Sequence, residues 1–197
     1  MKTKILSLIV LFAVMTGSAK TTNAAVAANS NYTVLNDIKA INKIEVRGNV
    51  QLFISDTTPE QVTVYNKYYA QNALVQSKNG VLRISSYSAV KLVVWVSSQN
   101  LQSVSAYDNA EIRSFGDVAK VQFNIDLHNN AMAKLKFDAH NVRVTLRDNA
   151  TIELSGRVDE FGMNRSKNSM VVANGLSVGH NIENTVIETG KEALAGA

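Results

Sequence analysis

The chain has 197 residues and no cysteine, so one or at most two domains are expected, and disulfide bonds and cysteine nucleophiles are excluded. Its formal charge is +4, but Lys2, Lys4 and Lys20 lie within residues 1–20, and the remainder carries 17 basic and 16 acidic groups. Because nucleic-acid binding requires a clustered basic face, we expect no nucleic-acid partner.

The N-terminus has the pattern of a secretory signal peptide. Two lysines precede an apolar run from Ile5 to Met15, and small residues follow. This run is too short for a transmembrane helix, which needs about 20 residues. We therefore assign residues 1–24 to a signal peptide, with cleavage between residues 19 and 27. The mature chain is expected to have no transmembrane segment and to be exported to the periplasm, the outer surface or the extracellular space.

The mature chain is expected to begin with a linker over residues 25–36, followed by a single β-repeat domain over residues 37–190 and a short tail over residues 191–197. The first part of this domain is rich in β-branched and aromatic residues, and turn-forming clusters interrupt it. Strands are predicted at Ile44–Ile54, Gln61–Tyr65, Ala73–Gln76, Gly80–Ser85 and Lys91–Ser97. Trp95, the only tryptophan in the sequence, lies in the most apolar of them, so core packing is expected there in preference to stacking on a sugar.

The second part contains four similar segments, each centred on an asparagine that a small residue follows. These asparagines are Asn109, Asn130, Asn149 and Asn168, and their separations are 21, 19 and 19 residues. A nearly fixed period of this length is typical of solenoid proteins. Asn49 fits the same template far upstream, and the stretch between Asn49 and Asn109 leaves room for three further coils.

Apolar residues alternate on both sides of each asparagine, as in Val142–Leu146 and Ala150–Leu154, which predicts two strands with one buried face each. The Asp-Asn or Asn-Asn step between them is typical of a bend, because these side chains bond to nearby backbone and tolerate left-handed geometry. We therefore predict an all-β, parallel β-helix-like fold with coils of about 19–21 residues. Its corner asparagines are expected to form a structural ladder of stacked amides.

The chain resembles the head GIN domain family of auto-transporter adhesins, exported proteins of unknown function that are common in Bacteroidota. The resemblance covers Ile38 to Glu188, and it is carried by Ile44–Ile54, Gly80–Ile84, Val93–Val96 and the repeated corners. The corners depart from the family pattern, since they read Asp-Asn-Ala or Lys-Asn-Ser where the family has Ser-Gly-Ser-Gly. The resemblance implies a right-handed β-solenoid of the cell envelope and an adhesin-like role.

In the predicted coils, the residues two positions before the corner asparagines stack in a column, which contains Tyr107, His128, Arg147 and Ser166. An aromatic ring, an imidazole and a guanidinium in a row form a candidate carbohydrate-binding strip, although solvated corner side chains would give the same pattern. The next column contains Asp108, Asn129, Asp148 and Lys167. The three histidines have no metal-type spacing, and nucleotide and hydrolase motifs are absent, so no metal or cofactor is expected.

These observations predict a non-enzymatic, adhesin-like module that binds a glycan or a surface protein. One alternative is a polysaccharide-active enzyme that uses Asp108, His128, Arg147 and Asp148, because carboxyls two coils apart fall within the range used by glycosidases. The other alternative is a structural protein that assembles with copies of itself through the end of the solenoid or a free edge strand.

Overall fold

The computed structural model describes residues 31–66 and 68–187, so the predicted signal peptide and the tail lie outside the described residues. The described chain contains fourteen strands and one 3-10 turn, η1 (Tyr69–Gln71), which makes it all-β as predicted. The strands are β1 (Thr33–Leu35), β2 (Lys43–Gly48), β3 (Val50–Ser55), β4 (Gln61–Val64), β5 (Ala73–Lys78), β6 (Val81–Ser86), β7 (Leu92–Ser97), β8 (Ser103–Tyr107), β9 (Glu111–Ser114), β10 (Val118–Leu127), β11 (Met132–Leu146), β12 (Thr151–Ser166), β13 (Met170–Val172) and β14 (Leu176–Ile187). Within these residues there is no helix long and apolar enough to span a membrane.

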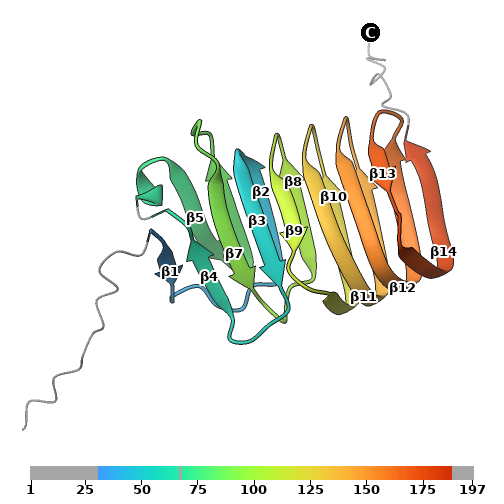
Figure 1. The fold of residues 1–197 in the computed structure, drawn as a ribbon, viewed down its shortest axis with the longest axis horizontal. Helices are drawn as coiled ribbons and strands as arrows, with labels where there is room; N and C mark the ends of the chain where they lie inside the picture. The colour runs from blue at the N-terminus through green and yellow to red at the C-terminus, as the bar shows by residue number, and fades with distance from the viewer. Residues whose placement is uncertain (1–30, 67, 188–197) are drawn as a thin grey trace, which may run out of the picture.

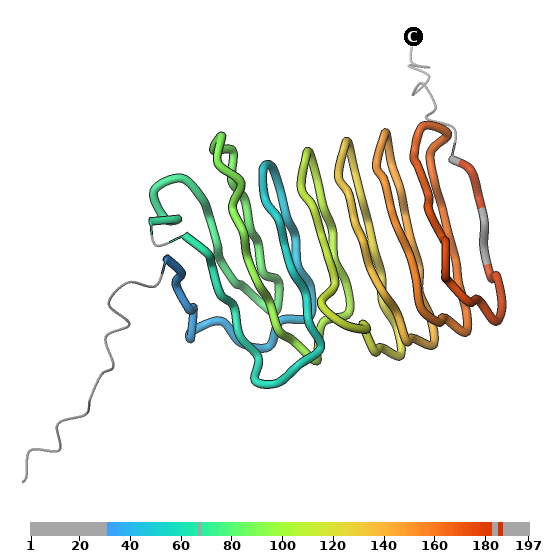
Figure 2. The backbone as a smooth tube through the Cα atoms, in the orientation of Figure 1, coloured from blue at the N-terminus to red at the C-terminus, as the bar shows by residue number. Residues whose placement is uncertain are grey.

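All fourteen strands belong to one open sheet that curls over on itself. Its hydrogen-bonded path runs β1-β4-β7-β3-β9-β11-β10-β8-β2-β6-β5, and β12 continues it with β13 and β14. We call the side with β4, β7, β3, β9 and the starts of β11 and β12 the β3 arm. The side with β6, β2, β8 and the ends of β10, β11 and β12 is the β2 arm. Successive narrow turns join the two arms (Figure 2).

The core lies between the two arms because apolar and polar residues alternate along their strands. In β2 and β3, Ile44, Val46, Leu52 and Ile54 are buried, whereas Glu45 and Phe53, which alternate with them, are only partly buried. The same alternation runs through β11 from Ala133 to Leu146, with one break at His140 and Asn141. Inward residues of both arms form one hydrophobic cluster. Burial of apolar surface at about 25 cal/mol per Å² stabilises this arrangement, and the alternate residues face outward.

In the second half of the chain, consecutive turns pair in parallel, and their register follows the asparagine spacing. Met132 of β11 pairs with Glu111 of β9 on one side and with Thr151 of β12 on the other. These three residues stand at the same place after Asn130, Asn109 and Asn149, two positions beyond each asparagine. The sequence spacing of the asparagines is therefore the strand register of this half.

In the first half of the chain, strand order in space differs from order in sequence. The β2–β3 turn lies directly beside the β8–β9 turn, since Lys43 pairs with Ser103 and Gln51 with Glu111. Figure 1 shows this cyan pair between the green and the yellow-green strands. The turns at Asn49 and Asn109 are therefore neighbours, and the expectation of three intervening coils is wrong. Residues 56–102 stack on the other side of β2 and β3, through β6 and β7.

Three other elements of the structure differ from the strands and linker predicted from the sequence. The segment Ile44–Ile54 is divided at Asn49 into β2 and β3, which belong to different arms. Strand β1 lies within residues 25–36, which we expected to be linker, and pairs antiparallel with β4 through Leu35 and Val62. Strands β4 and β5 also pair antiparallel, with β7 and β6 respectively. Antiparallel strands therefore cover the sheet edges at the N-terminal end.

Candidate binding surfaces

The corner between the arms is made by a column of residues in left-handed backbone conformation. Asp108, Asn129 and Asp148 have φ of 63°, 58° and 56°. The side chains of Asn129 and Asp148 each accept a hydrogen bond from the backbone N of the preceding residue in this column. Asn129 Oδ1 accepts from Asp108 N at 3.2 Å, and Asp148 Oδ2 accepts from Asn129 N at 2.9 Å. Asp and Asn adopt this conformation more readily than other non-glycine residues. This column therefore builds the corners.

The corner asparagines stand beside this column. Asn130 Nδ2 lies 3.5 Å from Asn109 Oδ1, and Asn149 Nδ2 lies 3.5 Å from Asn130 Oδ1. Backbone hydrogen bonds accompany these amide contacts. Asn130 N donates to Asp108 O, and Asn149 N donates to Asn129 O. Asn168 lies at the next corner, where Ser169 Oγ donates to Ser166 O. The amide contacts are long, so the backbone bonds hold the corners more strongly.

The predicted binding column begins as an aromatic stack on the outer face of the β2 arm. The rings of Tyr107 and His128 are 4.5 Å apart with an interplanar angle of 20°. The guanidinium of Arg47 lies 3.8 Å from the centre of the Tyr107 ring. Tyr107 and His128 are half-buried, and Arg47 is exposed. A cation over a tyrosine face contributes about 0.5–1 kcal/mol at such exposed sites, so the three groups support one another.

The other members of the column do not continue the stack. Arg147 follows His128 in the column and is exposed, and its backbone N donates to Leu127 O at 2.8 Å. Ser166 is buried, and its Oγ donates to Asp148 O at 2.6 Å. Tyr107 and His128 are therefore brought into contact, Arg147 extends the row, and Ser166 serves the corner.

Sequence reasoning missed Arg47, although the signal for it was present. Arg47 stands two residues before Asn49, as Tyr107 stands two residues before Asn109, and the register pairs Arg47 with Tyr107. The template shared by Asn49 and Asn109 would have placed Arg47 in the column. Coils between Asn49 and Asn109 would instead have separated Arg47 from Tyr107.

A polar hollow of about 240 Å³ lies on the same outer face, next to the stack along the same strands. Ser103 and Ser105 of β8 line it, and Ser105 is two residues before Tyr107. The remaining polar lining comes from the strands on either side: Lys43, Asn124, Asp126, Arg143 and Thr145. Short serine side chains between longer ones leave the space open. The hollow presents hydroxyl, amide, carboxylate and cationic groups to a ligand.

Two polar atoms, one on Asp126, which lines this hollow, and one on His128 of the stack, lack hydrogen bonds within the part of the chain that the structure describes. Asp126 Oδ1 and His128 Nε2 are both buried without a hydrogen-bond partner, although His128 Nε2 lies 3.0 Å from Asp126 Oδ2. Buried polar atoms without a partner are uncommon in folded proteins and often mark a site for water or ligand. His128 Nε2 therefore faces the Asp126 carboxylate, and Asp126 Oδ1 is the atom with unused hydrogen-bonding capacity at the end of the hollow nearest the aromatic stack.

An ionic cluster around Glu45 lies beside Lys43, at the β2 side of the hollow. Glu45 contacts Lys43 Nζ at 2.9 Å and Arg83 Nε at 3.0 Å. Partial burial alone would raise the pKa of Glu45, but these two cations outweigh burial and lower the pKa below 4.5. Glu45 therefore stays ionised at neutral pH and orients Lys43 beside the hollow.

The carboxylates named for the enzymatic alternative are engaged in the corners. Asp148 Oδ2 accepts from Asn129 N, and Asp108 Oδ2 accepts from the Tyr87 hydroxyl at 3.1 Å. That hydrogen bond raises the pKa of Tyr87. Among residues 31–66 and 68–187 no group of three or more His, Asp or Glu side chains is placed to hold a metal ion.

The outer face of the β3 arm carries an aromatic cluster that the sequence did not predict as a site. Trp95 and Phe53 stack with ring centres 5.8 Å apart, and Phe115 lies 4.8 Å from Trp95. Trp95 alternates with the buried Leu92, Val94 and Val96 and is only half-buried, so the expectation that it packs in the core is wrong. Outward Val93 and Trp95 made the strand look apolar on both faces.

The hollow and the aromatic cluster lie on outer sheet faces, as in proteins that bind through an extended surface. The chain belongs to the family described as "Putative auto-transporter adhesin, head GIN domain", whose model matches residues 40–185. This confirms the resemblance seen in the sequence. No match to this chain was found among curated proteins.

Solved structures share the fold at low sequence identity. A putative adhesin from Parabacteroides distasonis is similar with a TM-score of 0.57 and 18% identity, over 76% of this chain and 75% of that chain. A putative adhesin from Parabacteroides merdae has a TM-score of 0.56 and 15% identity over the same shares. A protein described as a putative lipid binding protein, also from P. distasonis, has a TM-score of 0.57 and 14% identity over 76% of each chain.

Proposed function

We propose that this protein is a non-enzymatic, adhesin-like module of the cell envelope that binds glycans through the outer face of its β2 arm. The observation that carries this proposal is the Tyr107–His128 stack at the end of the polar hollow. A sugar ring has an apolar face that packs against aromatic groups and hydroxyls that need donors and acceptors. The hollow offers the donors and acceptors, and the stack, two residues away along β8 and β10, offers aromatic ring edges, because Arg47 and His128 cover the two faces of Tyr107.

The regular stacking of the turns supports a role in binding through the outer surface. We interpret the stacked turns as a right-handed parallel β-solenoid, in which the regular strand registers place like positions one above another. Such a scaffold presents rows of side chains at a spacing of about 4.8 Å, which suits a long ligand. Export through the predicted signal peptide would bring this surface to the envelope.

A glycan fits the hollow better than a lipid does. The putative lipid binding protein from P. distasonis shares the fold, but at 14% identity the similarity concerns the fold alone. Here the lining is mostly hydroxyl, amide and charged groups. An acyl chain would leave these groups without hydrogen bonds, at a cost of about 1–3 kcal/mol for each one that becomes buried.

The corner hydrogen bonds favour binding over catalysis. A glycosidase needs one carboxyl that protonates the leaving group and another that acts as base or nucleophile. Asp108 and Asp148 instead hold a tyrosine hydroxyl and a backbone amide. Self-assembly through the edge of β14, the last strand of the sheet path, remains the structural alternative.

The proposal is tested by screening residues 25–197 on a glycan array and measuring the affinity of each glycan bound. Tyr107→Ala and His128→Ala should each weaken binding about tenfold, the equivalent of about 1.4 kcal/mol. Tyr65→Ala is the matched control. Tyr65 is an exposed aromatic residue directly after β4, its backbone N donates to Val93 O of β7 in the β3 arm, and its loss should leave this affinity unchanged.

Two results would contradict the proposal. One is glycan binding that Tyr107→Ala and His128→Ala leave unchanged. The other is release of shortened oligosaccharides from a bound polysaccharide, provided that Asp148→Ala abolishes it, which would support the enzymatic alternative.

A further inference from the structure

We infer that the outer face of the β3 arm is a second, independent binding site, which takes an acidic polysaccharide with its sugar rings on Trp95 and Phe53 and a carboxylate on Arg113. This site lies on the arm opposite the Tyr107–His128 stack and shares no residue with it. The inference rests on the aromatic cluster, the row of charged residues beside it, and the pairing state of those charges.

The aromatic cluster lies on the outer face of the sheet, where Phe115 is exposed and Trp95 and Phe53 are half-buried, and its rings are held in place. Strand register pairs Phe53 with Trp95 across β3 and β7, and the two rings are inclined by only 22°. Phe115 is 62% exposed and is fixed beside them because its backbone N donates to Ile54 O at 2.8 Å. Trp95 Nε1 donates to Ser97 Oγ at 3.3 Å, which orients the indole. Large apolar rings gathered at a protein surface are typical of a binding site.

The same row of the sheet continues from the aromatic pair into charged residues. Register places Arg113 beside Phe53, Lys134 beside Arg113 and Glu153 beside Lys134. Since neighbouring strands are about 4.8 Å apart, these outward residues form a straight track across the strands. A polymer that crosses the strands would meet aromatic rings first and cations next.

Arg113 is the less closely paired of the two cations in this track. Among the described residues its only ionic contact is to Glu111 Oε2 at 3.7 Å, and its side chain is 50% exposed. Glu111 is already engaged, because Lys91 Nζ lies 2.6 Å from Oε1 and Gln51 Nε2 donates to Oε2 at 3.0 Å. Lys134, by contrast, has Glu153 at 2.6 Å. The guanidinium of Arg113 therefore has donors available for an external anion, which it can bind in bidentate fashion.

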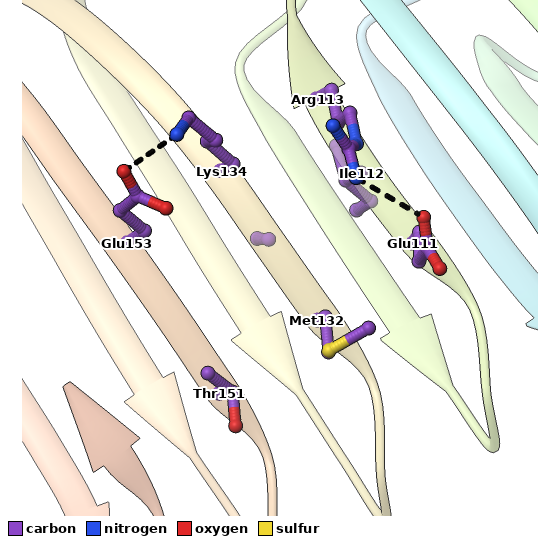
Figure 3. Close-up of a pocket in the computed structure, with 8 residues that line it drawn as sticks. Glu111, Ile112, Arg113, Met132, Lys134, Thr151 and Glu153 are labelled. Carbon is purple, nitrogen blue, oxygen red and sulfur yellow. Dashed lines mark hydrogen bonds and ion pairs between the residues drawn. The ribbon is translucent and has the colours of Figure 1, made fainter. Parts of the chain in front are cut away.

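A shallow hollow of about 140 Å³ lies next to Arg113 (Figure 3). Its floor is formed by the inward residues Ile112 and Ala133, and its rim by outward side chains of β9, β11 and β12. Figure 3 shows Arg113 and Glu111 on one side and Lys134 and Glu153 on the other. The hollow gives a ligand group a defined position between the two ion pairs.

These features favour an acidic glycan over an apolar partner. A purely apolar segment would cover Arg113 and remove its water without supplying an anion, at a large desolvation cost. A neutral glycan would stack on the rings but leave the guanidinium without a charge partner. A chain of pyranose rings that carry carboxylates satisfies both parts of the track.

The inference is tested by measuring binding of residues 25–197 to immobilised polygalacturonate, alginate and hyaluronate. Trp95→Ala and Arg113→Gln should each weaken binding to the acidic polysaccharide about tenfold or more. Phe115→Ala removes a more exposed ring and provides a second aromatic variant if Trp95→Ala lowers stability. Methyl-esterified polygalacturonate has the same rings without charge. Its affinity for the wild type should be as low as the affinity of polygalacturonate for Arg113→Gln.

Arg83→Gln is the matched control for charge, because Arg83 lies in the β2 arm with a side chain 49% exposed, against 50% for Arg113. This variant should bind the acidic polysaccharides as the wild type does. The inference is overturned if none of the three binds, if Arg83→Gln and Arg113→Gln lose affinity equally, or if the aromatic variants only abolish self-association in light scattering. Tyr107→Ala, which tests the β2 arm, should leave binding to this track unchanged, so the two proposals can fail separately.

Discussion

The β2–β3 turn and the β8–β9 turn lie side by side in the sheet, yet they form the same corner with different residues. Gly48 and Asp108 occupy equivalent positions, each directly after the paired residues Arg47 and Tyr107, and both have positive φ, of 79° and 63°. At Asp108 the backbone N donates a hydrogen bond to the side chain of the next corner. At Gly48 a side chain would collide with the neighbouring strand, since a Cβ there would lie 2.2 Å from Ser86 O.

The difference shows that the neighbour, and not the turn itself, determines which residue a corner accepts. Asparagine and aspartate occur where adjacent corners leave room for a side chain that also bonds to the backbone. Glycine occurs where the adjacent backbone approaches too closely. The β2–β3 turn therefore differs in sequence from the other turns at Gly48, although it has the same shape.

The largest effect is expected from Gly48→Ala. The added methyl group would collide with the Ser86 carbonyl, and φ of 79° is strained for alanine. We expect a loss of about 3 kcal/mol or more in the free energy of unfolding, measured by urea denaturation.

Gly116→Ala is the control that separates the two causes. Gly116 has the same φ of 79°, but no atom lies within 4 Å of its Cβ position. It should therefore show the conformational strain alone, about 1–2 kcal/mol. Equal losses for the two variants would show that close approach of the strands does not determine the corner residue.

An intermediate effect is expected from Glu60→Gln, which tests how the out-of-order segments are held together. Glu60 accepts hydrogen bonds from Ala40 N, Ile41 N and Ser98 Oγ at 2.8–2.9 Å. Partial burial acts to raise its pKa, but these bonds outweigh burial and lower the pKa below 4.5. Loss of the charged acceptor should cost about 1.5–3 kcal/mol at pH 7.

The pH dependence of Glu60→Gln has a defined sign. A lowered pKa in the folded state means that the stabilisation is complete above pH 4.5 and is lost as the pH falls through the folded pKa. The stability difference between wild type and variant should therefore be constant at neutral pH and shrink in acid. A difference that grows as the pH falls would contradict the assigned role.

The smallest effect is expected from Asn129→Gly in the regular turns. Glycine tolerates φ of 58°, so the variant removes only the two hydrogen bonds of the Asn129 side chain, from Asp108 N to Oδ1 and, at 3.5 Å, from Nδ2 to Asp148 Oδ2. It also raises the entropy of the unfolded chain. The expected loss is about 1 kcal/mol, measured by thermal unfolding. A gain in stability would show that the side-chain bond contributes nothing to the corner.

The sequence predicted the regular half of the fold well because its evidence is local. The spacing of Asn109, Asn130 and Asn149 equals the strand register, since one residue type marks one corner. The position of residues 56–102 could not be predicted, because long-range strand order leaves no periodic mark. The direction of Trp95 was missed for a related reason: apolar residues on both sides of a strand do not distinguish a buried face from an exposed binding face.

The candidate sites also divide into one that local sequence evidence predicts and one that depends on long-range strand order. Contact between Tyr107 and His128 was predictable from their equal positions before a corner asparagine. Stacking of Phe53 with Trp95 depends on the pairing of β3 with β7, strands that are far apart in the sequence. No corner motif links these two residues in the sequence.

The position of the β2–β3 turn has a consequence for synthesis of the chain. This turn is made early, but its neighbours on the two sides are residues 81–97 and 103–114. A nascent chain that ends before residue 81 has neither neighbour, so the edges of β2 and β3 remain unpaired and available to other chains. Such long-range pairing also slows folding. The unpaired edges of β2 and β3 therefore persist until residues 81–114 have been made.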